Sequence, residues 1–506
     1  MTPHPGDRTS PVTSSPQVAG DGALDARRTA DDDYLEELGY QPQLSRKLGQ
    51  FSAFALQFGT IAPIGGIVFT FAVGLAAVGP AMFWPWVVAG GLQLLIALCV
   101  AEACSAYPIA GGAYNIVSRL GGTFLGWQTG WWIELAHIFS LASSCIALVP
   151  VILAWFGVSV GHWGLVGAAA GLILISTLIN VASVRFSTRF VNAGVVATLI
   201  ACVLVSVGVV AALVFGDTSV HGAGYLFTTE GTVKGSILLP LLYAALLPCI
   251  VLNGFDVSGN TSEETKDAVR TVPRAMVRAN IVSYGFGTVV ILLLVLAMGR
   301  VGDTLAGVQP VTFILDPVLG HGLAKIFEGL AVLGLFVSAV VLQLAGARVL
   351  WAQARDDKLP LGSRFGSLNK ERVPAFAVWV TAGVAVLSTL WSSLYVVLIA
   401  MTVVLWVAGY GVLLTVVWLG KLRGTVPTAA FRVRGWRVIF PLTIVWSLLL
   451  CVVLIHQNPR QVGVGLLIAF AAGLAAYALS PARQSGHRAT RPAPPDEPGP
   501  STRHPH

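Results

Sequence analysis

The sequence predicts an all-α polytopic membrane protein with twelve transmembrane helices, and two observations support this class. The chain of 506 residues is 55% hydrophobic and 11% charged, with a mean hydropathy of +0.77. Soluble domains carry about 25% charged residues. Apolar runs of about 20 residues, the length that a helix needs to cross a bilayer, also recur along the chain. The net charge of +7 is therefore assigned to membrane orientation and not to nucleic-acid binding.

The expected transmembrane domain covers residues 41–480 and lies between two polar tails. Residues 1–40 and 481–506 are rich in Pro, Ser and charged residues, so we expect both tails to be disordered. No apolar segment follows Met1 closely, so we expect no cleavable signal peptide. The twelve spans are expected at about 51–78, 82–106, 124–154, 164–184, 190–215, 236–262, 276–299, 324–353, 374–391, 394–419, 438–455 and 462–479.

The basic residues predict the orientation of the spans. With the N-terminus inside, about 27 of the 31 Lys and Arg residues fall in the tails and inner loops, and about 4 fall outside. Cytoplasmic loops carry such an excess. We therefore expect a multi-pass protein of the cell (plasma) membrane with both termini in the cytoplasm, which requires an even number of spans.

The first apolar run, 51–78, is interrupted at its centre by Ile61–Ala62–Pro63–Ile64–Gly65–Gly66. Pro63 removes a backbone donor, and the glycine pair releases the backbone from helical geometry. Freed backbone groups are tolerated at membrane depth only where protein or a wet cavity satisfies them. We interpret the segment as a helix broken at mid-membrane, which is typical of a transporter binding site. The alternative is a Pro-kinked helix with nothing bound.

The sixth expected span, 236–262, carries a second irregular segment, Leu252–Asn253–Gly254–Phe255–Asp256. A charge and an amide at membrane depth are costly unless they face a cavity or the protein interior. The two breaks lie five spans apart, so equivalent helices would cross the membrane in opposite directions. This pairing favours a transporter and predicts an inverted repeat of five plus five helices, about 51–215 and 236–419, with two extra helices in 438–479.

The two breaks together predict a receptor for a zwitterion. A half-helix starting near Gly65 would direct its free N–H groups at a carboxylate. Unwound carbonyls near Ile61, Ala62, Leu252 and Asn253 would accept hydrogen bonds from an ammonium group. An α-amino or ω-amino acid fits both requirements, whereas a quaternary amine would need aromatic walls.

Four stretches of the chain carry recognisable motifs. They are 35–40 with 51–55 (LEELGY, FSAFA), 101–114 (AEACSAYPIAGGAY), 254–258 with 262–265 (GFDVS, SEET), and 354–360 with 373–374 (ARDDKLP, VP). Through these stretches the chain resembles the amino acid–polyamine–organocation superfamily of permeases, and its amino acid/choline (GABA-permease-like) branch in particular. The resemblance covers about residues 35–480 and implies the leucine-transporter-type fold, with substrate held between the breaks in spans one and six. That family's first break is usually a Gly-Ser/Thr-Gly turn, and Pro63–Gly66 lacks the hydroxyl.

Both breaks supply the candidate substrate-binding residues. We expect Asn253 to lie near the substrate and Phe255 to close over it. Asp256 could counter an amine or carry a proton, although capping of the second half of span six is favoured. The full set is Ile61, Ala62, Ile64, Gly65, Gly66, Leu252, Asn253, Phe255 and Asp256.

Three further residues are candidates for coupling or gating. Glu134 and His137 share a face of span three and could form a proton relay or an internal hydrogen-bonded pair. Glu102 could pair with Arg119 or Arg355 as an inner gate. In the family that the chain resembles, sodium-independent members often have a lysine in span five in place of a sodium ion. Residues 190–215 contain none, so the coupling ion stays open.

Glu263 and Glu264 follow the second break. We expect them to form a solvated ion-pair network with Lys266, Arg270 and Arg274 at the inner surface, where each pair contributes little to stability.

The leading hypothesis is a secondary active permease for an amino acid or related amine, working by alternating access. A choline, polyamine or GABA permease and an amino acid exchanger are alternatives within this class. A non-transporting membrane sensor is the alternative from another class. An enzyme is disfavoured because the sequence shows no cluster of titratable residues or metal ligands. The expected partners are a small-molecule substrate, the lipid bilayer and a co-transported proton, with no cofactor, metal or nucleic acid.

Overall fold

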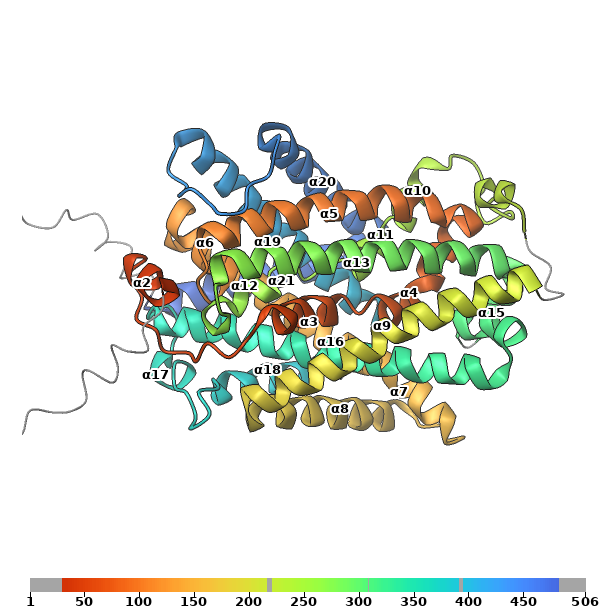
Figure 1. Cartoon of the computed structure of the whole chain (residues 1–506), viewed down its shortest axis with the longest axis horizontal. Helices are drawn as coiled ribbons and strands as arrows, with labels where there is room; N and C mark the ends of the chain where they lie inside the picture. The colour runs from red at the N-terminus through yellow and green to blue at the C-terminus, as the bar shows by residue number, and fades with distance from the viewer. Residues whose placement is uncertain (1–29, 216–220, 308, 391–394, 482–506) are drawn as a thin grey trace, which may run out of the picture. The chain divides into compact units, whose positions relative to one another are not determined.

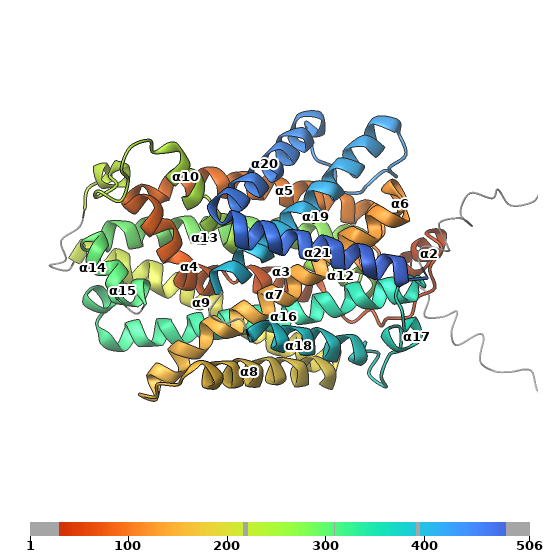
Figure 2. The ribbon, with the colours of Figure 1, turned by 180° about the vertical axis from the view of Figure 1, so that it is seen from behind.

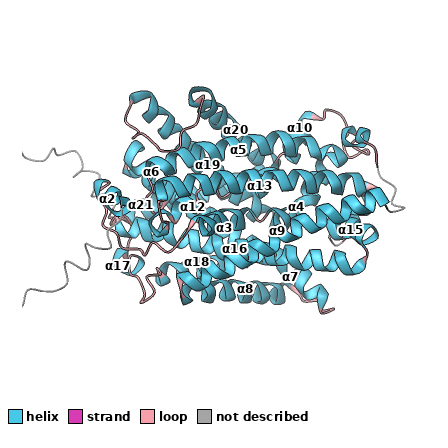
Figure 3. Cartoon of the chain, in the orientation of Figure 1, coloured by secondary structure: helices cyan, strands magenta, loops and turns pink. Residues whose placement is uncertain are grey.

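The computed structural model describes residues 30–215, 221–307, 309–390 and 395–481, and every regular element in these ranges is helical (Figure 3). Nine helical segments in these ranges are long and apolar enough to cross a membrane. The first of them, Gln50–Ala106, contains the first break, and three shorter apolar helices lie at Leu238–Val251, Pro310–Leu319 and Ala375–Thr389. The predicted class, an all-helical polytopic membrane protein, is confirmed.

The bundle formed after Gln43 contains long helices that run side by side and short helices that connect them (Figure 1). α9 and α13 lie toward the viewer in Figure 1, and α7, α19 and α21 lie toward the viewer in Figure 2. The helices are α3 Gln50–Ile61, α4 Pro63–Val78, η1 Gly79–Met82, α5 Phe83–Ala106, α6 Gly112–Gly121, α7 Thr123–Trp155, α8 His162–Ala182, α9 Val184–Phe215, η2 Ala223–Phe227, α10 Leu238–Ala244, α11 Leu246–Val251, α12 Val257–Asn260, η3 Ser262–Glu264, α13 Ala268–Ala297, α14 Val301–Ala306, α15 Pro310–Leu319, α16 His321–Arg355, α17 Gly362–Phe365, α18 Ala375–Thr389, α19 Tyr395–Arg423, α20 Trp436–Gln457 and α21 Pro459–Leu479.

Some expected boundaries are wrong. The seventh span was expected from residue 276, but α13 begins at Ala268, so Arg270 and Arg274 lie on a helix and not in a loop. The N-terminal tail also contains helix α2, Ala30–Glu37, where disorder was expected. Its first turn holds Asp31, Asp32 and Asp33, which suits the positive end of the helix dipole. The rest of the expected disordered tails, residues 1–29 and 482–506, lies outside the described residues.

The first broken helix is interrupted at Ala62, between α3 and α4. Ala62 adopts the left-handed conformation, with φ 41° and ψ 63°. The residue before a proline is disfavoured in the right-handed helical region, and Pro63 is well suited to the first position of a new helix. Gly65 and Gly66 are helical, so the expected restart near Gly65 is wrong by two residues, and the glycines do not form the break.

The second broken helix is interrupted between α11 and α12. Gly254 has a φ of 72°, and a Cβ there would lie 2.6 Å from the Thr60 side chain of α3. Only glycine satisfies both conditions without strain. The two breaks therefore contact each other, as their matching positions in the sequence predict.

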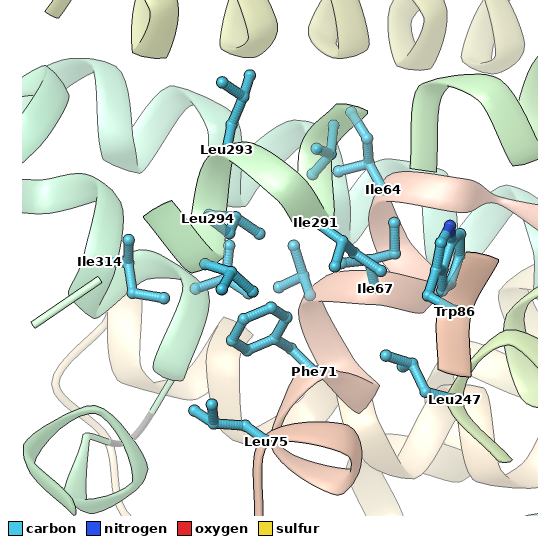
Figure 4. Close-up of a cluster of buried hydrophobic side chains, with 14 of the residues drawn as sticks. Ile64, Ile67, Phe71, Leu75, Trp86, Leu247, Ile291, Leu293, Leu294 and Ile314 are labelled. Carbon is cyan, nitrogen blue, oxygen red and sulfur yellow. The ribbon is translucent and has the colours of Figure 1, made fainter. Parts of the chain in front are cut away.

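The α4 half of the first span packs into a buried apolar cluster (Figure 4). In lipid, helices associate through close van der Waals packing because the surrounding acyl chains are as apolar as the side chains. Ile64, Ile67, Phe71 and Leu75 recur every three or four residues and so share one face of α4. Their partners include Trp86 of α5, Leu247 of α11, Ile291 and Leu294 of α13, and Ile314 of α15.

Close packing predicts that adding one methyl group between α13 and α5 destabilises the fold. A Cβ at Gly287 would lie 2.3 Å from the Trp86 ring, whereas nothing lies within 4 Å of a Cβ at Gly285 on the same helix. Gly287→Ala should lower stability by about 1–3 kcal/mol. Thermal unfolding of the purified protein in detergent checks this, with Gly285→Ala as the matched control. Equal melting temperatures for the two variants would contradict the packing argument.

Candidate functional site

A cavity lies at the meeting point of the two breaks, lined by residues of α3, α4, α7, α11, α16 and α19 and by Asn253 of the second break. Among the described residues, its lining carries no charged side chain. Hydroxyl groups are the main polar groups there, contributed by Thr60, Thr70, Ser140, Ser143, Ser144, Ser338 and Thr402, and the aromatic side chains are Phe69, Tyr395 and Trp406. The site can therefore hold a small molecule through hydrogen bonds and apolar contacts.

Three predicted site residues line the cavity: Ile61, Gly66 and Asn253. The Asn253 side chain is buried, and its oxygen accepts a hydrogen bond from the Gly254 amide at 2.8 Å. Its Nδ2 has no hydrogen-bond partner among the described residues. Asn253 thus offers a donor at the cavity wall, which suits the predicted place near a substrate.

Four other predicted site residues, three from the first break and Leu252 from the second, have packing roles in the structure. Ile64 belongs to the apolar cluster of α4, as does Leu252 after the end of α11. A Cβ at Gly65 would lie 2.9 Å from the Leu335 amide nitrogen, so this glycine permits close contact with α16. Ala62 forms the left-handed junction itself. None of these four is among the residues that line the cavity.

Phe255 does not line the cavity, where the sequence placed an aromatic side chain over the substrate. It is buried against Tyr410 of α19, with ring centroids 5.3 Å apart. The aromatic walls of the cavity come from Phe69, Tyr395 and Trp406 instead. The sequence did not indicate that these three residues share a site, because they come together only when α4 and α19 pack in the fold.

Asp256 occupies the N-cap position of α12, but its side chain makes no capping hydrogen bond. The favoured interpretation as a helix cap is therefore wrong. Its carboxylate accepts hydrogen bonds from the Tyr410 hydroxyl at 2.6 Å and from the Asn260 side-chain amide at 3.0 Å. Asp256 is fully buried, so these two donors compensate for the water that the carboxylate has lost.

Two residues that sequence reasoning missed hold the breaks together. The fully buried Gln57 of α3 donates to the Gly254 carbonyl at 2.8 Å and accepts from the Ser258 amide at 3.2 Å. Ser338 of α16 donates to the Thr60 carbonyl at 2.7 Å. An amide within an apolar span is itself a signal, because unpaired polar groups are costly in lipid. Gln57 could have been found on this ground.

Glu134 and His137 are both buried on α7 but approach different helices. Glu134 accepts from the Thr381 hydroxyl of α18 at 3.2 Å, and its second carboxylate oxygen has no partner among the described residues. The His137 ring meets the edge of Trp406 on α19, with centroids 5.6 Å apart. No hydrogen bond or ion pair joins the two in the described part of the chain, so the pair alternative gains no support.

Glu102 pairs with Lys421 of α19, and its second oxygen accepts from the Val433 amide at 3.1 Å. The predicted partners, Arg119 and Arg355, are wrong. Arg355 instead pairs with Glu263 at 2.7 Å. Lys421 follows more than 300 residues after Glu102, so nothing local in the sequence indicated this pairing.

Buried ion pairs join the segment after the second break to α16. The expected solvated network at this position is therefore wrong. Glu264 pairs with Arg348 of α16 at 2.7 Å, with side chains only 3% and 2% exposed. The Leu48 amide donates to the Glu264 carbonyl at 2.9 Å, and the side chain of the nearby Arg46 donates to the Thr265 carbonyl. We call this region, residues 46–48 and 262–265 with Arg348 and Arg355, the closed end. Ser338 lines the cavity, and Arg348 lies about 15 Å further along the same helix.

The fold and the cavity together define a membrane transporter. Two helices broken at mid-membrane around a common cavity are typical of secondary transporters. The family model for amino acid permeases matches residues 48–477, and the chain belongs to this family. It is a transporter and not an enzyme, as predicted.

Curated relatives cover most of the chain at low identity. Amino-acid permease BAT1 of Arabidopsis thaliana is 27% identical over 393 residues, covering 69% of this chain and 72% of the relative. The branched-chain amino acid permease BcaP of Lactococcus lactis is 27% identical, covering 66% of this chain and 73% of the relative. The thiamine transporter thi9 of Schizosaccharomyces pombe is 26% identical, covering 72% and 70%.

The closed end predicts a large effect of removing one member of the buried ion pair. Arg348→Ala leaves Glu264 buried without its partner and should destabilise the protein by about 3–5 kcal/mol. Thermal unfolding in detergent measures this, with Arg364→Ala at an exposed position of α17 as control. The double replacement Arg348→Met with Glu264→Leu should recover most of the loss. A single variant as stable as the control would contradict the assignment.

Proposed function

We propose that this protein is a secondary active permease that moves an amino acid with a neutral side chain across the cell membrane by alternating access. The observation that carries the proposal is the cavity at the two breaks, where the unpartnered Nδ2 of Asn253 lies among hydroxyl groups. Two of the relatives, BAT1 and BcaP, are named as amino acid permeases, which supports an amino acid as substrate.

The start of α4 is the proposed carboxylate site. Pro63 has no N–H, and the Gly66 amide is already bonded to the Ala62 carbonyl at 2.7 Å. The amides of Ile64 and Gly65 remain in the first turn, at the positive end of the helix dipole. Neither residue lines the cavity, so the carboxylate must reach this turn from the side of Ile61 and Gly66, which do line it. A substrate carboxylate there needs no cationic side chain. The ammonium group is assigned to the backbone carbonyls at Ile61 and Asn253.

The hydroxyl and apolar lining supports a neutral substrate side chain. Ser143 and Ser144 of α7 line the cavity together with Ile250 and Val251 of α11. A charged side chain would need an oppositely charged partner to compensate for lost hydration. Small or branched apolar side chains and hydroxyl side chains fit such a lining without one.

The proposed topology has twelve spans, with α3 and α4 as span one and α10 to α12 as span six. Spans one to five (about 51–215) and six to ten (about 236–419) form the inverted repeat, and α20 and α21 are the two extra helices. Tails and transporter domain divide at about residues 40 and 480, with both termini cytoplasmic. The closed end then faces the cytoplasm, and transport requires its ion pairs to separate in the inward-facing state.

Proton coupling is assigned to Glu134, with His137 as a second candidate. A carboxylate at membrane depth with one oxygen unpartnered is costly in its charged form and readily holds a proton. Glu134 lies on α7, which also lines the cavity through Ser140 and Ser143. Its proton could therefore respond to whether the cavity is occupied.

An organic cation is the second candidate substrate. Phe69, Tyr395 and Trp406 border the cavity, and aromatic faces attract cations such as quaternary amines. The relative thi9 is named as a thiamine transporter. The uptake assay below separates the two candidates.

Purified protein in proteoliposomes should take up radiolabelled neutral amino acids and should take up lysine, glutamate, choline and thiamine poorly. Asn253→Ala removes the free donor and should weaken substrate binding about tenfold, as expected for one buried hydrogen bond. Binding is measured by competition with a labelled substrate. Asn458→Ala, at the junction of α20 and α21, is the control. Uptake of choline or thiamine alone would replace the proposal with the second candidate, and no uptake of any compound would refute it.

Glu134→Gln should abolish accumulation driven by a proton gradient while leaving exchange of substrate across the vesicle membrane. The amide keeps the hydrogen bond from Thr381 but cannot release a proton. Accumulation and exchange are measured in the same vesicles, with His137→Gln as a parallel variant and the exposed Glu371→Gln as control. Proton-driven accumulation that survives in both buried variants rules out this coupling site.

A further inference from the structure

A second hollow lies outside the transport cavity, between α3 and α13 on the surface near the closed end. It is lined by Gln50, Phe51 and Phe54 of α3 and by Thr271, Arg274, Ala275 and Arg278 of α13. We call it the α3–α13 groove. Its lining contains two aromatic rings and two guanidinium groups. One of its two helices, α3, also carries Gln57 and Thr60.

The arginines of this groove belong to a regular stripe. Arg270, Arg274 and Arg278 recur every four residues and so share one face of α13, with about 6 Å of rise between neighbours. All three are exposed. None takes part in an ion pair or side-chain hydrogen bond among the described residues. The nearby carboxylates Glu263 and Glu264 are already bound to Arg355 and Arg348.

The groove lies at the depth of lipid headgroups. Arg278 is the last charged residue of α13, and residues 279–297 continue as an uncharged span. On the facing helix, Arg46 and Lys47 precede α3, and the side chain of Phe51 is 47% exposed at its start. The polar ends of both helices therefore pass into their apolar spans at this groove.

We propose that the α3–α13 groove binds the phosphate group of an anionic membrane phospholipid, with an acyl chain lying along Phe51 and Phe54. Guanidinium groups bind phosphate oxygens in a two-pronged arrangement, and basic hollows between transmembrane helices suit anionic headgroups. The exposed aromatic side chain distinguishes a lipid from a free anion, since inorganic phosphate gains nothing from apolar contact. The bound lipid would hold α3, the half-helix that ends at the first break, against α13.

The test uses the purified full-length protein in a neutral detergent, with binding of phosphatidylglycerol and phosphatidylcholine followed by native mass spectrometry. The wild type should prefer phosphatidylglycerol. Arg274→Gln with Arg278→Gln should weaken phosphatidylglycerol binding about 25-fold, at roughly fivefold for each arginine near a membrane surface. Arg274→Lys with Arg278→Lys keeps the charge but removes the two-pronged hydrogen bonding, so this variant should lose less phosphatidylglycerol binding than the glutamine variant.

The matched control is Arg185→Gln with Arg189→Gln. These arginines are also exposed, lie four residues apart and stand at the start of α9, but they are not among the residues that line the α3–α13 groove. An equal loss in both pairs would show a general annulus of anionic lipid and overturn the proposal. Unchanged binding in the Arg274/Arg278 variant would also overturn it. Inorganic phosphate that competes as well as phosphatidylglycerol would identify a soluble-anion site instead.

Discussion

The hydrogen bonds of Gln57 are the interaction on which the centre of this protein depends. An unsatisfied backbone group in hydrocarbon costs several kcal/mol, so a helix broken at mid-membrane needs partners from elsewhere in the protein. Gln57 supplies a donor to the Gly254 carbonyl and an acceptor to the Ser258 amide. Ser338 supplies the donor for Thr60. Each break is stable because its neighbours satisfy it, and the cavity is the space that the two breaks leave between them.

The two sides of this centre differ in their chemistry. The cavity side carries hydroxyl groups and aromatic rings, whereas the closed end carries carboxylates paired with Arg348 and Arg355. A buried ion pair contributes little net stability against an apolar pair of the same size, but it is costly to separate in the dry interior. Paired charges therefore suit a barrier that must be either fully formed or fully hydrated. Hydroxyl groups suit a surface that exchanges one ligand for water.

Much of the fold could be predicted from the sequence because its signals are local. Long apolar runs predict the spans, and Pro63 and Gly254 predict the neighbourhoods of both breaks. The details that could not be predicted depend on distant contacts. Gly65 is small because α16 passes within contact distance of it, and Glu102 pairs with Lys421. Pro63 interrupts the span as predicted, but it also starts α4 and places the left-handed residue one position earlier, at Ala62.

A binding site built from backbone and hydroxyl groups has a physical advantage for a carrier that must return empty. A charged side chain at the cavity would be left without its partner each time the substrate departs, and a buried unpaired charge is costly. The dipole at the start of α4 carries only partial charge, and its amide N–H groups can donate to water as well as to a carboxylate. Asp256 of the second break does not line the cavity, and its carboxylate is bound by Tyr410 and Asn260. The empty site then differs from the loaded one by exchanged hydrogen bonds and not by an exposed ion, which keeps the two states close in energy.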